Sequence, residues 1–476
     1  MKKLLSLFTA AVMICVFCPF IHAADITGKC GNNLTWTLTP DGTLTVSGEG
    51  EMHAYTNYPW EGAGSITAVV IGEGVTSVAH TAFEACTELT RVQLADSVTS
   101  IDEAAFYRCS ALKEVRFGTG LTAIGDHAFR GCSALTEAMI PDSVVSIGTH
   151  AFYQCGSLTA VHLPASLTAL PPYGFQECAS LCTVEIPNGV PEIPTCCFFR
   201  CGALSSVTIP ESVTDIGIYA FRDCKSLSWV DLPQGLKTIG ERAFMDCQSL
   251  QSAALPAQLT EIGAYAFFRC FNLNSIEVPG SVSVVQKYAF YECCYAKEIV
   301  LQEGVTKIEE GAFLNCFYVP SVALPSSIAV IEKEAFKGCD ALTEISYPAS
   351  QEEWNKVQIG ENNGMVGAYH KHQYELTLTV PAAYMQAGRN EYTCSICSKV
   401  LVEEIPALPY RPGDTDLDGR ISAEDARLAL RRAVELETFA ETSLSYRAAD
   451  VDCSGTVTAA DARLILRAAV GLGTLS

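Results

Sequence analysis

The sequence is short of positive charge. Its 476 residues hold 31 Lys and Arg against 53 Asp and Glu, so the formal net charge is −22. A chain this acidic is repelled by phosphate backbones and anionic lipid, which argues against nucleic acid and membrane surfaces as partners. The chain also lacks a long apolar run after residue 20, and we expect no membrane insertion there. Disorder is excluded, because 49% of the residues are hydrophobic.

The amino-terminal segment is the exception to the lack of apolar runs. Two lysines precede an apolar stretch from Leu4 to Phe20, and the segment ends in the small residue Ala23. This order predicts a secretory signal peptide over residues 1–23, with cleavage after Ala23. A transmembrane anchor is the alternative, but the run is short and polar chain follows at once. We therefore expect a secreted, extracellular product.

One pattern returns every 23 residues from Ala82 to about Leu342 without an insertion or deletion. Each unit reads A-F-x-x-C-x-x-L-x-x-V-x-L-P-x-x-V-x-x-I: a short apolar turn, a strand of period two, a Pro stop and a second extended piece. No unit can close its own core, so a strict period in the twenties predicts a solenoid of stacked coils. The repeated Phe residues are Phe83, Phe106, Phe129, Phe152, Phe175, Phe198, Phe221, Phe244, Phe267, Phe290, Phe313 and Phe336.

A Cys follows each repeated Phe by three positions, from Cys86 to Cys339. Abundant Cys in a secreted protein ordinarily suggests disulfides. Here, however, the thiols hold one inward position of the repeat, and equivalent positions of successive coils face the core instead of converging in pairs. We expect a ladder of buried free thiols.

The segment before the array has the features of a cap. Alternating apolar residues on both sides of Pro40-Asp41-Gly42 predict a β-hairpin. A degenerate repeat follows, in which Trp60 lies 23 residues before Phe83. Atypical terminal coils are what an open-ended core requires.

The repeated run A-F-x-x-C-x-x-L-x-x-V-x-L-P resembles the BspA-like (Treponema pallidum-type) leucine-rich repeats of bacterial surface and secreted proteins. The resemblance covers more than half of the chain. It implies a leucine-rich-repeat solenoid, a β-rich α/β coil with a 23-residue period, and a habit of binding partners. It names no ligand.

Aromatic residues recur beside the repeated Phe, at the position after it and two positions before it. They predict a stripe along the middle coils that binds a protein or glycan, since rings offer large contact area at low entropic cost. The alternative is that the rings fill the groove between coils. The stripe residues proposed for ligand binding are Tyr107, Tyr153, Phe199, Tyr219, Tyr265, Phe268, Tyr288 and Tyr291.

A small Cys-containing module follows the repeats. His370, His372, Cys394 and Cys397 suggest a metal site, but a single C-x-x-C with distant histidines is a weak signal, because closed zinc sites need four well-placed ligands. A local disulfide and two free thiols are the alternatives.

The strongest chemical signal lies near the carboxy terminus. Residues 414–425 read D-T-D-L-D-G-R-I-S-A-E-D, with carboxylates at loop places 1, 3, 5 and 12 and Gly at place 6. Ca²⁺ needs six or more oxygen ligands, and this spacing wraps them around one point. The motif returns 36 residues later with Ser454 in place of one acid, which predicts a second, weaker calcium ion. A solvated acidic turn is the alternative for either loop.

The predicted calcium ligands share these loop places in the two copies, with the seventh residue acting through its carbonyl oxygen and the ninth either directly or through water. They are Asp414, Asp416, Asp418, Arg420, Ser422, Asp425, Asp450, Asp452, Ser454, Thr456, Thr458 and Asp461.

The loops depart from an ordinary EF-hand. Place 12 is Asp instead of Glu, and the Pro residues before Asp414 leave no room for an entering helix. Each loop leads into one of two matching helical segments, which start at Asp425 and Asp461. This arrangement closely resembles a type I dockerin. The resemblance implies a small all-α calcium-binding domain that docks onto a cohesin module of a scaffoldin, as in the cellulosomes of bacteria that degrade plant polysaccharides.

The dockerin resemblance also implies a set of cohesin-binding residues in each half. Leu428 and Leu464 are expected in the domain core instead. Carried over by position, the recognition residues are Ala423, Glu424, Leu430, Arg431, Glu435, Ala459, Ala460, Leu466, Arg467 and Gly471.

The combined pattern favours a secreted, non-catalytic adaptor whose repeats bind a partner and whose dockerin fixes it to an extracellular complex. An enzyme is the second reading, because dockerins usually accompany glycoside hydrolases, but no acid pair or nucleophile–base motif is recognisable. A surface adhesin is the third. The predicted segments are the signal peptide (1–23), a β cap with a degenerate repeat (24–81), the BspA-like repeats (82–348), a repeat cap (349–369), the Cys-containing module (370–406), a Pro-rich linker (407–412) and the dockerin (413–476).

Overall fold

The computed structural model describes residues 24–370, 374–382, 386–395, 399–436, 438, 440 and 443–475. The predicted signal peptide lies outside these residues. The chain divides into two compact units between Tyr369 and His370, and each unit is described by itself. None of the helices in the described residues combines the length and apolar character that crossing a membrane requires.

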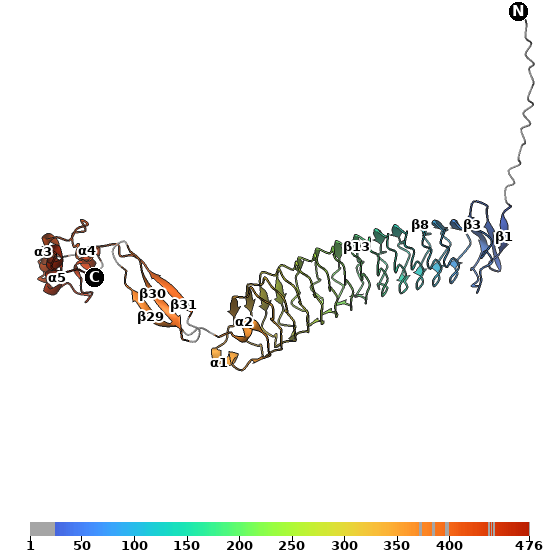
Figure 1. The fold of residues 1–476 in the computed structure, drawn as a ribbon. Coiled ribbons are helices and arrows are strands. Elements are labelled where there is room, and N and C mark those ends of the chain that lie inside the picture. The colour runs from blue at the N-terminus through green and yellow to red at the C-terminus, as the bar shows by residue number, and fades with distance from the viewer. Residues whose placement is uncertain are drawn as a thin grey trace, which may run out of the picture. The chain divides into compact units, whose positions relative to one another are not determined.

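The first unit is a solenoid of about 13 turns with a 23-residue period, visible as stacked coils in Figure 1. Each regular coil gives one short strand to each of two parallel ladders. Residues one period apart pair, as Arg91 does with Glu114 in the first ladder and Ser77 with Ser100 in the second. The predicted strand and second extended piece are therefore confirmed.

The strands of the first ladder alternate between buried and exposed side chains. They are β4 (Ala68–Ile71), β6 (Arg91–Leu94), β8 (Glu114–Arg116), β10 (Glu137–Met139), β12 (Ala160–His162), β13 (Thr183–Glu185), β15 (Ser206–Thr208), β17 (Trp229–Val230), β19 (Ser252–Ala253), β21 (Ile276–Val278), β23 (Ile299–Leu301), β25 (Ser321–Ala323) and β27 (Glu344–Ser346).

The strands of the second ladder have two residues each. They are β5 (Ser77–Val78), β7 (Ser100–Ile101), β9 (Ala123–Ile124), β11 (Ser146–Ile147), β14 (Glu192–Ile193), β16 (Asp215–Ile216), β18 (Thr238–Ile239), β20 (Glu261–Ile262), β22 (Val284–Val285), β24 (Lys307–Ile308), β26 (Val330–Ile331) and β28 (Gln358–Ile359). The ladder is interrupted between β11 and β14 and again between β20 and β22. At the first interruption Pro171 takes the place of Gly148, whose N–H bonds to Ile124 O of the preceding coil at 2.8 Å, and Pro has no N–H to donate.

The predicted hairpin forms the amino-terminal end of the solenoid (Figure 1). β1 (Ile26–Lys29), β2 (Asn33–Leu38) and β3 (Thr43–Glu49) pair antiparallel, and β3 then pairs parallel with β4. The turn before β3 contains Gly42 at φ +84°, where a Cβ would lie 2.9 Å from Ser65 O. Only Gly fits this position without strain.

The repeated Phe side chains form a continuous stack through the solenoid core. From Trp60 to Phe336, successive rings have centroids 5.2 to 5.7 Å apart and planes within 2 to 14° of parallel. The degenerate repeat is therefore the first layer of the core, with Trp60 in the Phe position.

The predicted thiol ladder is confirmed for the repeat cysteines, which are all free. Cys86 is half-buried and the others are buried. The structure adds a hydrogen bond that the sequence did not suggest. In each coil from Cys109 to Cys339 the thiol donates to the carbonyl of the Phe in the preceding coil, at 3.0 to 3.3 Å.

The turn that carries the Phe has an unusual backbone. Residues two before and two after it adopt left-handed conformations, such as Tyr219 (φ 58°) and Asp223 (φ 60°) around Phe221. As a result, the N–H groups of Tyr219, Phe221 and Asp223 all point toward the next coil. Phe221 N, for example, donates to Ala243 O at 2.8 Å. Non-Gly residues are strained in this region, and we infer that the hydrogen bonds between coils offset the strain. We call residues two before, one after and two after each repeated Phe the turn face.

Side chains close this hydrogen-bond ladder at both ends. Trp60 Nε1 donates to Ala82 O at 3.1 Å in the first coil. At the other end Phe336 N donates to Asn363 Oδ1 at 3.1 Å, and Asn363 Nδ2 donates to Glu332 O at 2.9 Å. The buried Asn363 amide therefore replaces the missing next coil. It lies just before α2 (Gly364–Gly367), and α1 (Gln351–Trp354) precedes it.

The described residues of the second unit form a sheet and three helices. β29 (Tyr374–Val380), β30 (Gly388–Cys394) and β31 (Val400–Ile405) form an antiparallel sheet. The helices are α3 (Ala423–Ala433), α4 (Leu444–Ala449) and α5 (Ala459–Ala469). Cys394 Sγ lies 3.6 Å from His370 Nε2. His372 and Cys397 lie outside the described residues, so the chemistry of the C-x-x-C pair stays a prediction.

Candidate functional site

Two near-identical loop–helix segments make up the helical part of the second unit. α3 begins with a capping box in which Ser422 Oγ accepts from Glu424 N at 3.1 Å and Ser422 N donates to Asp425 Oδ2 at 2.8 Å. α5 repeats this geometry with Thr458 and Asp461, where Thr458 N donates to Asp461 Oδ2 at 2.8 Å. Each loop is therefore fixed to the start of its helix by a buried carboxylate.

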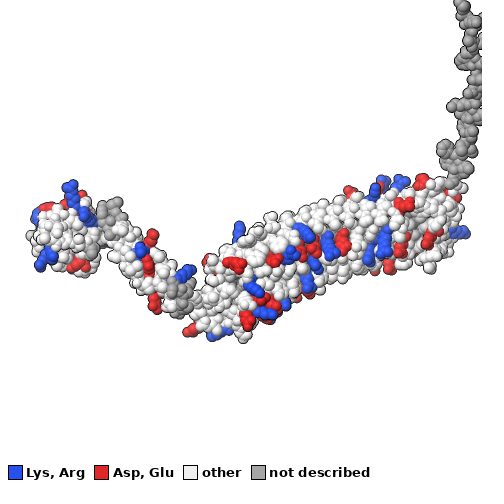
Figure 2. All heavy atoms as spheres, in the orientation of Figure 1, with Lys and Arg blue, Asp and Glu red and all other residues white. Residues whose placement is uncertain are grey.

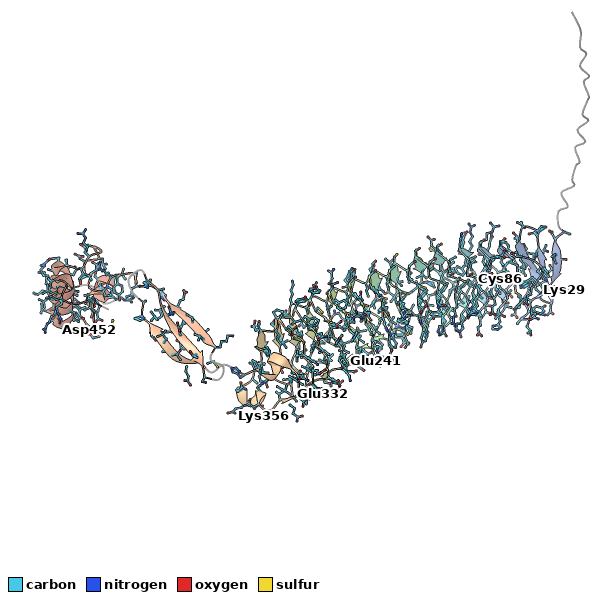
Figure 3. All side chains as sticks on the ribbon, in the orientation of Figure 1. Lys29, Cys86, Glu241, Glu332, Lys356 and Asp452 are labelled. Atoms are coloured by element: carbon cyan, nitrogen blue, oxygen red, sulfur yellow. The ribbon has the colours of Figure 1, made fainter. Side chains whose placement is uncertain are left out.

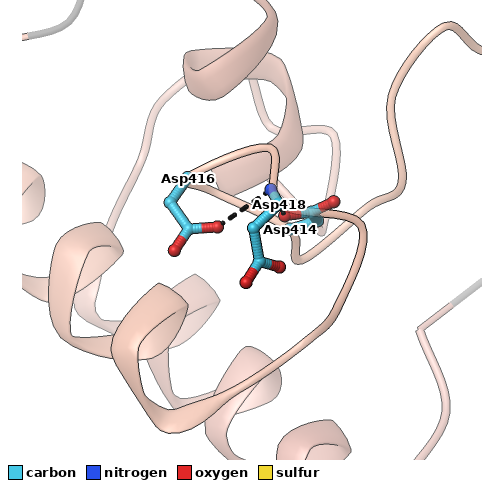
Figure 4. Close-up of side chains that lie close together, drawn as sticks. All are labelled: Asp414, Asp416 and Asp418. Carbon is cyan, nitrogen blue, oxygen red and sulfur yellow. Dashed lines mark hydrogen bonds between the residues drawn. The ribbon is translucent and has the colours of Figure 1, made fainter.

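The first loop gathers three carboxylates. Oxygen atoms of Asp414, Asp416 and Asp418 lie within 4.8 Å of one another, and Figure 4 shows the three side chains around one point. Backbone N–H groups hold them there, because Asp418 N donates to Asp416 Oδ1 at 3.1 Å and Gly419 N donates to Asp414 Oδ2 at 2.8 Å. Gly419 has φ +90°, as the sharp turn at place 6 requires.

The charges of the first loop are uncompensated within the protein. In the part of the chain that the structure describes, no Lys or Arg forms an ion pair with Asp414, Asp416 or Asp418. Partial desolvation and the neighbouring carboxylates raise the pKa of Asp416. An all-oxygen set of carboxylates, held together against their mutual repulsion, suits a hard divalent cation such as Ca²⁺.

The second loop gathers a different trio. Oxygen atoms of Asp450, Asp452 and Asp461 lie within 4.8 Å of one another. Ser454 stands where the first loop has Asp418, and its hydroxyl lowers the pKa of Asp452 by hydrogen bonding. The second loop thus has one carboxylate fewer at its tip.

The remaining predicted ligands are only partly directed toward these trios. Asp425 is fully buried and accepts from Thr415 N at 2.6 Å. The hydroxyls of Ser422 and Thr458 donate to the capping carboxylates at 3.0 and 2.9 Å. Place 9 therefore acts first as a helix cap. The carbonyl oxygens of Arg420 and Thr456 occupy place 7 of their loops, and Thr456 O accepts from Ser454 Oγ at 3.1 Å.

Small side chains pack the two matching helices together. Ala426 and Ala429 of α3 are buried, as are Ala462 and Ile465 of α5. The expectation that Leu464 is a core residue is wrong, because its side chain is 38% exposed. The buried face of α5 is formed by Asp461, Ala462 and Ile465, and Leu464 lies outside that face. The other leucine expected in the core, Leu428, is half-buried.

The residues predicted to bind a cohesin are exposed except for the half-buried Arg431. Leu430 and Leu466 are 45% and 46% exposed, and they occupy equivalent places on α3 and α5. The equivalent arginines each donate to a carbonyl five residues on, at 3.4 Å. The exposed set comprises Ala423, Glu424, Leu430, Glu435, Ala459, Ala460, Leu466, Arg467 and Gly471.

Helix α4 was not predicted from the sequence. It has only six residues, and Ser443 caps it by accepting from Tyr446 N at 3.2 Å. The sequence signal for α4 is this Ser followed by an apolar residue. The helix is too short to show a periodic apolar pattern. α4 ends at the start of the second loop, so a helix precedes the second loop. We expected no such helix before the first loop.

The predicted aromatic stripe lies on the turn face of the solenoid, and its side chains are half-buried. Phe268 and Tyr291 stack with centroids 4.4 Å apart and planes 9° apart, and Tyr265 and Tyr288 lie 5.2 Å apart. The rings therefore contact one another from coil to coil and also expose part of their surface. The half-buried set is Tyr107, Tyr153, Phe199, Tyr219, Tyr265, Phe268, Tyr288 and Tyr291.

Arginines, which the sequence analysis missed, separate these rings. Arg242 lies over the rings of both Tyr219 and Tyr265, with Cζ 5.6 and 4.7 Å from the centroids. Arg222 likewise contacts Phe199 and Tyr219. The signal that could have revealed them is their place in the 23-residue register, because they occupy the same positions as the aromatic residues.

Comparison with known proteins gives the following matches. The profile of the BspA type leucine rich repeat region matches residues 55–182, 169–296 and 260–358. The chain is similar to a leucine-rich repeat protein from Bacteroides ovatus at 26% identity, over 70% of this chain and 90% of that one, with a TM-score of 0.53.

Two further crystal structures are similar in sequence. A leucine rich cell surface protein from Faecalibacterium prausnitzii is 28% identical over 71% of this chain and 98% of that one, with a TM-score of 0.42. The T. pallidum leucine-rich repeat protein is 26% identical over 52% and 91%, with a TM-score of 0.27. No curated protein sequence matches the chain.

Proposed function

Because the chain belongs to the BspA type leucine-rich repeat family, we propose that it is a secreted, non-catalytic binding protein whose solenoid takes a protein or glycan partner. The observation that carries this proposal is the stripe of half-buried rings on the turn face. The rings lie at a fixed spacing on a rigid stack, so a ligand contacts them without ordering loops. The matches are to repeat proteins, with no enzyme family among them, which supports a non-catalytic role.

The helical part of the second unit is proposed to be a dockerin. The duplicated loops and helices support two calcium ions and a cohesin-binding surface around Leu430 and Leu466. Ligands would be supplied by the Asp414 and Asp450 loops, and a bound calcium would neutralise carboxylates that otherwise repel one another. The protein would then be an adaptor fixed to a cohesin-bearing, cellulosome-like complex.

Calorimetric titration of the full chain against a panel of cohesin modules tests the dockerin proposal. We expect tight binding in calcium that is lost with a chelator. The double variant Leu430→Ala/Leu466→Ala is expected to weaken binding about tenfold or more, because buried apolar anchors dominate interfaces. Leu444→Ala, on α4 and 39% exposed, is the matched control. If no cohesin binds although both loops take calcium, the adaptor proposal fails, and the protein is a free surface adhesin with a stabilising tail.

Affinity electrophoresis through xylan, glucomannan and mixed-linkage glucan tests the stripe. The variant Phe268→Ala/Tyr291→Ala removes the closest ring pair and should weaken retardation about tenfold, since each stacked ring contributes on the order of 1 kcal/mol. Trp229→Ala is the control, because Trp229 is 48% exposed but lies on β17, away from the turn face. A variant that loses stability and keeps its retardation would mean that the rings only fill the groove between coils.

A further inference from the structure

Two arginines at the amino-terminal part of the turn face lie on one tyrosine. Arg108 Cζ is 4.9 Å and Arg130 Cζ 5.5 Å from the centroid of Tyr107, and Arg130 also lies 4.8 Å from Tyr153. The rings hold the two guanidinium groups on adjacent coils. None of the described residues offers either of them a carboxylate within salt-bridge distance.

Arginines at the equivalent turn-face positions of later coils form ion pairs with acidic residues. Arg200 pairs with Glu177 at 3.2 Å, Arg222 with Asp223 at 3.5 Å and Arg269 with Asp246 at 3.3 Å. Figure 2 shows basic and acidic side chains interspersed along this part of the solenoid. In Figure 3, Glu241, which pairs with Arg242 of the turn face, lies farther from the amino-terminal end than Cys86. The uncompensated arginines are thus confined to the first coils.

Two histidines extend this basic cluster. Arg130 Nη1 lies 3.4 Å from His127 Nδ1, and the His127 ring stacks on His150 with centroids 4.9 Å apart. His150 in turn stacks on Tyr173 at 4.5 Å and 2°. His150 Nδ1 is buried and has no hydrogen-bond partner among the described residues. Burial and the neighbouring His127 and Arg130 lower the pKa of His150.

The backbone of these coils is already used. Arg108 N donates to Arg130 O at 2.7 Å, and His127 N donates to Thr149 O at 2.9 Å. An extended peptide would find these N–H groups occupied, so strand addition is excluded on this face. A ligand must therefore be bound by the guanidinium, imidazole and phenol groups of the side chains. These groups suit a ligand that has both carboxylate and hydroxyl oxygens.

We propose that Arg108, Arg130, His127 and His150 form a subsite for an acidic glycan, a saccharide chain bearing carboxylates. The guanidinium groups would bind the carboxylates of sugars on adjacent coils, and the imidazole and phenol groups would meet ring hydroxyls. This inference rests on the proposed ligand-binding role of the turn face and assigns its ligand a chemical class.

The test is calorimetric titration of the full chain with oligogalacturonate. We expect binding that falls about tenfold or more in Arg108→Gln/Arg130→Gln, because two charge-assisted contacts are lost. Arg91→Gln/Arg116→Gln, which removes the same charge from exposed positions of β6 and β8 away from the turn face, should bind as wild type does. The wild-type protein should bind methyl-esterified oligogalacturonate only as weakly as Arg108→Gln/Arg130→Gln binds the unesterified acid. Added salt should weaken binding of the acid only.

Three results would overturn the inference. One is the absence of binding to oligogalacturonate, and another is binding that Arg108→Gln/Arg130→Gln leaves unchanged. The third is equally strong, equally variant-sensitive binding of poly-L-glutamate, which would assign the site to acidic peptides. If neutral xylan or glucomannan still binds and depends on Phe268 and Tyr291, the proposed function stands while this subsite fails. Circular dichroism of each variant separates a binding defect from misfolding.

Discussion

Raising the pH from about 8 to about 10.5 under reducing conditions is expected to unfold the solenoid, because its core is built on protonated thiols. Burial raises the pKa of Cys86 to about 11 and that of Cys178 to about 12. Burial raises the pKa of the other repeat thiols as well, namely Cys109, Cys132, Cys155, Cys201, Cys224, Cys247, Cys270, Cys293 and Cys316.

The direction of the effect follows from proton binding. A thiol whose pKa is higher in the folded than in the unfolded state stabilises the fold fully at low pH. That contribution is lost once the pH rises past the unfolded value of about 8.5. Each such thiol then removes about 1.4 kcal/mol of unfolding free energy per pH unit. A whole domain has roughly 5–15 kcal/mol, so the thiols together exceed it within one or two pH units.

Urea unfolding followed by circular dichroism at pH 7, 8, 9 and 10 measures this loss. The variant Cys201→Ala/Cys224→Ala/Cys247→Ala removes three titrating groups from adjacent coils and should fall less steeply with pH, although it starts from a lower midpoint. Cys182→Ala, which removes an exposed thiol, should follow the wild-type slope. Equal slopes in all three proteins would show that the thiols do not control alkaline stability.

Replacing Phe198 by Ala is expected to lower the unfolding free energy by roughly 3–5 kcal/mol, the range for deleting a buried Phe. Phe198 is fully buried and stacks on Phe175 at 5.7 Å and Phe221 at 5.4 Å. The variant loses both contacts in the middle of the stack. Because coils contact only their neighbours, we expect the coils on the two sides of Phe198→Ala to unfold in separate transitions.

Ile218→Ala is the control for this substitution. Ile218 is 44% exposed, and surface changes usually stay within about 0.5 kcal/mol. Urea titration followed by both near- and far-ultraviolet circular dichroism measures the effect. A loss below about 1 kcal/mol in Phe198→Ala would contradict the view that the ring stack couples the coils.

The repeat core was predictable because its information is periodic. Phe and Cys recur at 23-residue intervals, so burial at one coil implies burial at the next, and the structure confirms the stack and the thiol ladder. The calcium-loop motif likewise located two carboxylate clusters. Its prediction of bound calcium stays a prediction.

The features that the sequence did not reveal are not marked by a recurring residue type. The left-handed turn residues include His150, Tyr219 and Glu334, none of which signals that conformation, because hydrogen bonds between coils impose it. Asn363 closes the ladder as a single residue with no counterpart elsewhere. Leu464 is apolar and was expected in the core, but the face of α5 that packs inward carries Ala462 and Ile465 instead.

The ladder closed by Asn363 has a mechanical consequence. Its hydrogen bonds run from one coil to the next, so tension applied through the two ends of the chain pulls coils apart instead of shearing them past one another. The bonds then break coil by coil from an end. Each coil that opens releases 23 residues, which lengthens the tether by roughly 70 Å. A solenoid held at one end and gripped along its side would therefore yield in steps and absorb a sudden load before either attachment gives way.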